Sequence, residues 1–68
     1  MKVIVNGKIQ ELPEGSKAAD LVHALNMQND KIAMEVNMEI IPRSQYPNFQ
    51  LNEGDKVEIV RAIGGGCV

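Results

Sequence analysis

The sequence has few of the residues on which catalytic and metal sites depend. It contains one cysteine and one histidine in 68 residues, so no internal disulfide can form and no set of metal ligands sits at the usual spacing. No serine, histidine and acidic residue are spaced as a catalytic triad. His23, in a segment expected to be helical, is interpreted as a helix-surface residue rather than a base. We therefore expect a protein that is not an enzyme and binds no metal or cofactor of its own, in a reducing cytoplasm.

Aromatic residues, strong charge and long apolar runs are also scarce. Tyr46 and Phe49 are the only aromatic residues, so aliphatic side chains and methionine must build the core. The net charge of −2 lacks the basic field that a nucleic-acid or anionic-membrane binder needs. No apolar run is long enough to span a membrane, and we expect no signal peptide. A single domain of this size buries only about 60% of its unfolded surface, which leaves little room for an enclosed catalytic pocket.

The first half of the chain predicts a hairpin followed by a helix. Two extended segments, residues 3–5 and 8–12, flank Asn6-Gly7, a pair that readily takes the positive φ angles of a tight hairpin turn. Ser16 is the predicted N-cap of the helix, because its hydroxyl can accept from first-turn amides. Asn26 is a candidate for the helix end. Apolar residues then recur at helical spacing on one face: Ala18, Leu21, Val22 and Leu25.

The second half predicts further strands. Residues 31–36 alternate as a strand, residues 39–41 form a short extended piece, and residues 49–51 can pair briefly as an edge strand. Between them, residues 43–48 form an irregular loop or one helical turn. Residues 56–63 form a last strand rich in Val and Ile, which favours a central position beside the first strand. A mixed sheet of about five strands with one helix laid across it is an α+β fold, the ubiquitin-like β-grasp.

The chain ends in Gly64-Gly65-Gly66-Cys67-Val68. Glycines have no side chain to pack and lose the most backbone entropy on ordering, so we expect a β-grasp domain over residues 1–63 and a flexible tail over 64–68. Fully extended, five residues reach about 17 Å, enough to thread a narrow channel in another protein. The alternative is a terminus that merely frays.

Motifs along the whole chain resemble the ThiS sulfur carriers of thiamin biosynthesis. They begin with Met1 to Gly7, and in the middle include Val36-Asn37, Ile40 to Arg43 and Tyr46. They end with Asn52 to Val60 and the three glycines. Each motif alone is weak, but their order and the glycine ending are fairly specific, and the resemblance runs through Gly66.

The resemblance implies a chemistry for the tail. In ThiS-like and MoaD-like carriers, a ThiF/MoeB-type adenylyltransferase uses ATP to activate the terminal glycine carboxylate. That carboxylate becomes a thiocarboxylate with sulfur from a persulfide, and the carrier donates the sulfur to a synthase such as the ThiG-like thiazole synthase. AMP is a good leaving group, which makes the acyl carbon attackable. By position, the reactive residue would be Gly66, with Gly65 beside it.

The sequence departs from that pattern because Cys67 and Val68 follow Gly66. We expect a precursor from which a JAMM-type zinc peptidase removes this dipeptide. The departure leaves the sulfur acceptor open between thiamin thiazole, an amino-acid precursor and a secondary metabolite. Cys67 is either a spare residue of the leaving dipeptide or a thiol that takes the Gly66 acyl group in an N-to-S shift. Thiol reactivity favours a cationic neighbour, and the nearest cationic residue in sequence is Arg61.

Two other functions remain possible from the residues. One is a ubiquitin-like modifier conjugated to lysines through Gly66, and the other is a β-grasp interaction module of the TGS type without terminal chemistry. The resemblance also implies that an apolar face with Phe49 and Val60 or Ile63 docks on the activating enzyme, although each side chain can equally belong to the core. Arg43 and Arg61 are candidates for weak ion pairs at the rim.

Overall fold

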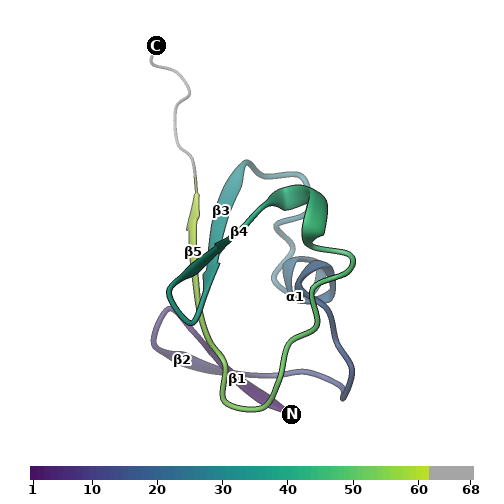
Figure 1. Ribbon diagram of the computed structural model, residues 1–68, viewed down its shortest axis with the longest axis vertical. Helices are drawn as coiled ribbons and strands as arrows, with labels where there is room; N and C mark the ends of the chain where they lie inside the picture. The colour runs from purple at the N-terminus through teal and green to yellow at the C-terminus, as the bar shows by residue number, and fades with distance from the viewer. Residues whose placement is uncertain (62–68) are drawn as a thin grey trace.

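The computed structural model describes residues 1–61, and these form one five-stranded mixed sheet with a helix against one face (Figure 1). The elements are β1 (Lys2–Val5), β2 (Lys8–Glu11), α1 (Ala18–Ala24), β3 (Ile32–Val36), β4 (Glu39–Ile41), the 3-10 helix η1 (Arg43–Gln45) and β5 (Lys56–Arg61). The strand order is β2-β1-β5-β3-β4. The predicted β-grasp architecture is confirmed.

The last strand occupies the centre of the sheet, as predicted. It runs parallel to β1, with Val5 beside Val57, and antiparallel to β3 over five residue pairs from Ile32–Arg61 to Val36–Val57. The outer strands are antiparallel to their neighbours, β2 to β1 and β4 to β3. The inward-facing side chains of this central strand, Val57 and Ile59, are buried in the core.

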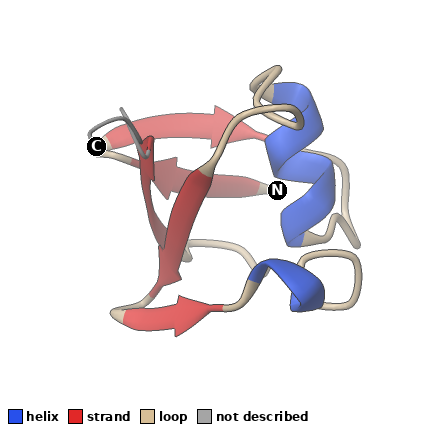
Figure 2. Ribbon diagram, turned by 90° about the horizontal axis from the view of Figure 1, so that it is seen from above, coloured by secondary structure: helices blue, strands red, loops and turns tan. Residues whose placement is uncertain are grey.

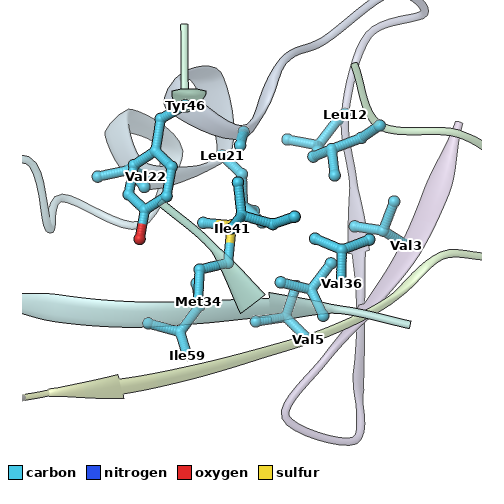
Figure 3. Close-up of a cluster of buried hydrophobic side chains, with 13 residues drawn as sticks. Val3, Val5, Leu12, Leu21, Val22, Met34, Val36, Ile41, Tyr46 and Ile59 are labelled. Atoms are coloured by element: carbon cyan, nitrogen blue, oxygen red, sulfur yellow. The ribbon is translucent and has the colours of Figure 1, made fainter. Parts of the chain in front are cut away.

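The core lies between the sheet and α1. Figure 2 shows α1 and η1 on the same side of the strands. The predicted helix face is confirmed, since Ala18, Leu21 and Val22 are buried and Leu25 packs against the core at partial exposure. Figure 3 shows the side chains that the sheet and the helix place in this core. The fully buried side chains of greatest volume are Leu21, Met34, Leu51, Val3 and Val57.

The helix begins one residue later than predicted, and the predicted Ser16 cap is wrong. Ser16 is buried, and its hydroxyl donates to the Pro13 carbonyl at 2.7 Å, so it stabilises the preceding turn instead. Lys17 is the N-cap, and the Asp20 carboxylate accepts from the Lys17 amide at 2.8 Å. Asn26, with φ of 64°, follows the helix in the left-handed conformation common at helix ends.

Residues 49–51 pair with the segment that leads into α1 rather than with an edge of the sheet. Gln50 forms an isolated antiparallel bridge with Lys17, and the Ala18 amide donates to the Phe49 carbonyl at 2.8 Å. The Leu51 amide donates to the Ser16 carbonyl at 2.9 Å. These hydrogen bonds connect residues 49–51 to the amino end of α1 and hold the loop before β5 against the helix.

Candidate functional site

The candidate site is the end of β5, because this central strand leads into the glycine tail. Arg61 is the last residue of β5 that the structure describes, and Gly64 to Gly66 follow three to five positions later. The tail positions that the sequence predicts to react or to be processed, Gly65, Gly66, Cys67 and Val68, lie outside the described residues, as does Ile63. The boundary predicted at residue 63 also falls there. What the structure defines is the support from which the tail leaves.

Asn6 holds β5 from the β1 side. Its backbone amide donates to the Val57 carbonyl at 2.9 Å. Its side chain then continues the ladder beyond the end of β1, donating to the Ile59 carbonyl at 3.1 Å and accepting from the Ile59 amide at 2.9 Å. Asn6 has φ of 50°, a left-handed conformation that asparagine tolerates better than most residues. The hairpin turn therefore also holds the central strand in place through hydrogen bonds.

Asn37 holds β5 from the β3 side in a similar way. Its backbone amide donates to the Lys56 carbonyl at 2.7 Å, and its side-chain oxygen accepts from the Lys56 amide at 3.0 Å. Its side-chain nitrogen donates to the Asp55 carboxylate at 3.0 Å. Asn37 is also left-handed, with φ of 51°. Two turn asparagines thus fix β5 from both neighbouring strands.

Two arginines bind the loop before β3, Arg61 from the end of β5 and Arg43 from η1. Arg61 forms an ion pair with the Asp30 carboxylate at 3.0 Å. Arg43 donates to the backbone carbonyls of Asp30 and Gln28 at 2.8 and 2.9 Å. The sequence predicts both side chains at the rim of a partner interface, and in the structure both bond to residues of their own chain. Burial raises the pKa of the nearby Tyr46 phenol, and the positive charge of Arg43 opposes that shift.

The outer face of the sheet, opposite α1, carries exposed apolar side chains. Because Val57 and Ile59 are buried, Val60 points outward, and the same alternation places Ile9 and Ile40 outward. These three side chains are 63–69% exposed. A shallow hollow of about 120 Å³ lies on this face beside Val60. It is lined by Ala33, Met34, Glu35, Ile40, Glu58 and Val60.

The structure separates Phe49 from Val60, so the two side chains do not form one exposed apolar face, and docking through either residue stays a prediction. Val60 lies on the outer face, whereas Phe49 is partly buried and packs against the core on the α1 side. The reason is the pairing of residues 49–51 with the segment before α1, which turns Phe49 inward. Val60 is exposed and pairs with Ala33 of β3, and Ile40 of β4 lines the same hollow as Val60.

His23 and the acidic residues form no metal centre in the described part of the chain. Within residues 1–61, no three His, Cys, Asp or Glu side chains lie close enough together to hold a metal ion. His23 is exposed on α1, as expected from its position. In the same range, no helix is long and apolar enough to cross a membrane.

The five-stranded mixed sheet and the helix against it define a small β-grasp protein. The model of the ThiS family matches residues 3–66. The chain therefore belongs to the ThiS family, as its resemblance predicted.

Curated relatives include small sulfur carriers and much longer thiazole synthases. Sulfur carrier protein ThiS of Bacillus subtilis is 32% identical over 63 residues, which are 91% of this chain and 96% of the relative. Its Escherichia coli counterpart is 24% identical over 66 residues, 97% of this chain and 100% of the relative. A thiazole synthase of Paramagnetospirillum magneticum is 39% identical over 66 residues, and the chain spans only 20% of its length.

Solved structures agree with the family. The crystal structure of a thiamine biosynthesis protein, ThiS, from Geobacter metallireducens is 30% identical. It superposes with a TM-score of 0.81, over 97% of this chain and 100% of that one. The solution structure of a thiamine biosynthesis protein from the same organism superposes with a TM-score of 0.77.

Sequence reasoning missed the roles of the asparagines and of the outer-face glutamates. The sequence predicts Asn6 only as part of a hairpin turn, and the side-chain bonds of Asn6 and Asn37 to β5 depend on tertiary contacts that no local pattern specifies. Glu35 and Glu58 both fall on the polar face of an alternating strand. Their direct opposition depends on strand register, which the sequence does not specify.

Proposed function

We propose that this chain is a sulfur carrier whose Gly66 becomes a thiocarboxylate after Cys67 and Val68 are removed. The observation that carries the proposal is the family match, which ends at Gly66 and leaves the last two residues outside. The support is structural as well, because the tail follows a central strand held on both sides by Asn6 and Asn37. A rigid support keeps the position of the reactive end defined relative to a docked enzyme.

The chemistry requires a free carboxylate on Gly66. Hydrolysis of the Gly66–Cys67 peptide bond, by a JAMM-type zinc peptidase, consumes one water and releases the Cys-Val dipeptide. The new carboxylate attacks the α-phosphorus of ATP in a ThiF/MoeB-type adenylyltransferase, and pyrophosphate leaves. A persulfide sulfur then displaces AMP, and a second thiol reduces the resulting acyl disulfide to the thiocarboxylate. The carrier itself supplies the acyl group, and its partner binds the ATP.

Glycine suits this role for a steric reason. A residue without Cβ leaves the acyl carbon unhindered and lets the backbone approach a nucleotide or a second active site closely. The carrier must enter several such sites in turn. Gly65 also lacks a side chain, so both residues can enter a narrow active site. Only Gly66 carries the reacting carbon.

A thiazole synthase is the sulfur acceptor that we favour. The chain is similar to about a fifth of two thiazole synthases, from Paramagnetospirillum magneticum and Magnetococcus marinus. In those proteins, a segment like this chain is part of the same polypeptide as the remainder of a thiazole synthase. That linkage favours thiamin thiazole over an amino-acid precursor as the destination of the sulfur.

Mass spectrometry of two matched chains tests the carrier function. A chain ended at Gly66 and the full-length chain are each incubated with the adenylyltransferase, ATP and a persulfide donor. We expect the shortened chain to gain the mass of one sulfur-for-oxygen exchange, and the full-length chain to gain it only when the peptidase is added. A shortened chain that is never loaded would overturn the proposal. A ladder of lysine adducts in cell extracts would indicate a modifier instead.

The Cys67→Ser variant separates peptidase cleavage from the acyl shift. We expect peptidase-dependent loading of this variant to equal that of the unchanged full-length chain. Loss of loading in the variant, together with loading of the unchanged chain without ATP, would mean that the Cys67 thiol takes part.

A further inference from the structure

Two glutamates face each other directly on the outer face of the sheet. Glu35 of β3 is the register partner of Glu58 of β5, and their strand neighbours Met34, Val36 and Val57 are buried, so both carboxylates point outward. Like charges placed directly opposite across two strands destabilise a sheet. The pair therefore works against the stability of the domain.

The described part of the chain offers this pair no ion-pair partner. The two ion pairs within residues 1–61 join Arg61 to Asp30 and the N-terminal amine to Glu14. Lys56 lines a hollow of about 410 Å³ together with both glutamates, yet it forms no ion pair with either. The two carboxylates remain available to a group from another molecule.

The surroundings of the pair suit a long cationic side chain. Glu35 and Glu58 line both the hollow beside Lys56 and the hollow beside Val60. The second hollow has apolar walls from Ala33, Ile40 and Val60. A guanidinium can bond two carboxylates through its planar fork, while its aliphatic stem packs on apolar neighbours.

The pair also lies within reach of the reacting end. Val60 and Glu58 belong to the strand that leads to the tail, and Gly66 is five residues after Arg61. Five residues span at most about 17 Å. An enzyme that holds Gly66 in its active site must therefore come close to the end of β5, where its surface can cover the outer face.

We propose that the Glu35–Glu58 pair binds an arginine side chain of the adenylating enzyme, with apolar residues of that enzyme around it on Ile40 and Val60. The inference rests on the proposed function and specifies how the partner is recognised. The arginine relieves the repulsion between the carboxylates, so the same two charges lower the stability of the free carrier and raise its affinity for the partner.

Neutral variants of the two glutamates test the proposal through two measurements: affinity for the enzyme should fall, whereas the stability of the free chain should not. Glu35→Gln, Glu58→Gln and the double variant, each ended at Gly66, are titrated calorimetrically against the ThiF-type adenylyltransferase of the source organism at low and high salt. Each single change should weaken binding about tenfold and reduce its salt dependence. The urea midpoint of unfolding should stay equal or rise. The matched control Glu11→Gln, on the same face at the far edge strand, should bind within about twofold of the unchanged chain.

The outcomes separate this inference from the function on which it rests. ATP–pyrophosphate exchange with the unchanged shortened chain supports the carrier function, and its absence sinks that function. If the unchanged chain supports exchange but the double variant binds the enzyme with unchanged affinity, the inference is overturned while the carrier function stands. Two further results also overturn it: binding abolished by EDTA and restored by calcium, which indicates a cation between the carboxylates, and a glutamate-dependent dimer of the chain in sedimentation.

Discussion

The side chain of Asn6 takes the place of a strand neighbour for Ile59, with one hydrogen bond to its carbonyl and one from its amide. The two residues are 53 positions apart in sequence. Without this contact, the edge of β5 that faces β1 would lose its partner immediately after Val57, where β1 ends. The Asn6–Ile59 contact extends the support of the central strand toward the tail.

Replacing Asn6 should destabilise the domain. Asn6→Ala removes two hydrogen bonds and places alanine at positive φ, which together should cost about 2–3 kcal/mol of unfolding free energy. Asn6→Gly relaxes the backbone strain and should cost only about 1–2 kcal/mol, from the hydrogen bonds alone. Urea denaturation measures both values. Equal losses in the two variants would show that the left-handed conformation contributes nothing.

Arg43 should matter more for stability than Arg61. Arg43→Ala removes donors to two loop carbonyls and should lower the unfolding free energy by about 1–2 kcal/mol. Arg61→Ala removes an exposed ion pair with Asp30 and should cost less than about 1 kcal/mol, and still less at high salt. The comparison uses urea midpoints at two salt concentrations. A larger loss for Arg61→Ala would contradict this ranking.

The sequence predicts the fold well because the patterns that specify it are local. The Asn6-Gly7 turn, the helix face around Leu21 and the Val- and Ile-rich last strand each indicate their element without tertiary information. The errors lie where another contact competes with the pattern, a local one for Ser16 and a tertiary one for Phe49. Ser16 looks like a cap, yet its hydroxyl donates back to Pro13. Phe49 looks like part of a surface, yet backbone pairing with the segment before α1 turns it toward the core.

Tyr46 should make stability depend on alkaline pH. Burial raises the pKa of its phenol above the ordinary value of 10.0. Below about pH 8, the phenol is neutral in both states and the pKa shift has no effect. As the pH rises beyond that value, the unfolded chain loses the proton first, so the unfolding free energy falls until the folded phenol also ionises. Urea melts from pH 8 to 11 should show a steeper decline for the unchanged chain than for Tyr46→Phe.

The tyrosine itself reports the same event. Tyr46 is the only tyrosine, so near-ultraviolet absorbance of tyrosinate follows its ionisation directly. The midpoint in the folded chain should exceed that measured in urea. Identical midpoints in the two states would contradict a burial-raised pKa.

Val60 and Phe49 should respond to substitution in opposite ways. Val60→Thr keeps the β-branched shape suited to a strand and changes only an exposed outer-face group, so stability should stay within about 0.5 kcal/mol. If the outer face docks on the adenylating enzyme, the buried hydroxyl should weaken binding about tenfold. Phe49→Ala should instead remove part of the core and cost about 1–3 kcal/mol of stability, because the ring is only partly buried.

Calorimetric titration and urea denaturation of the same two variants distinguish the possibilities, provided that Phe49→Ala is titrated at a temperature where it is folded. The docking face predicted from sequence joined these residues, and the fold separates them. Weakened binding by folded Phe49→Ala with unchanged binding by Val60→Thr would move the docking surface to the α1 side. The reverse result keeps it on the outer sheet, beside the strand that carries the tail.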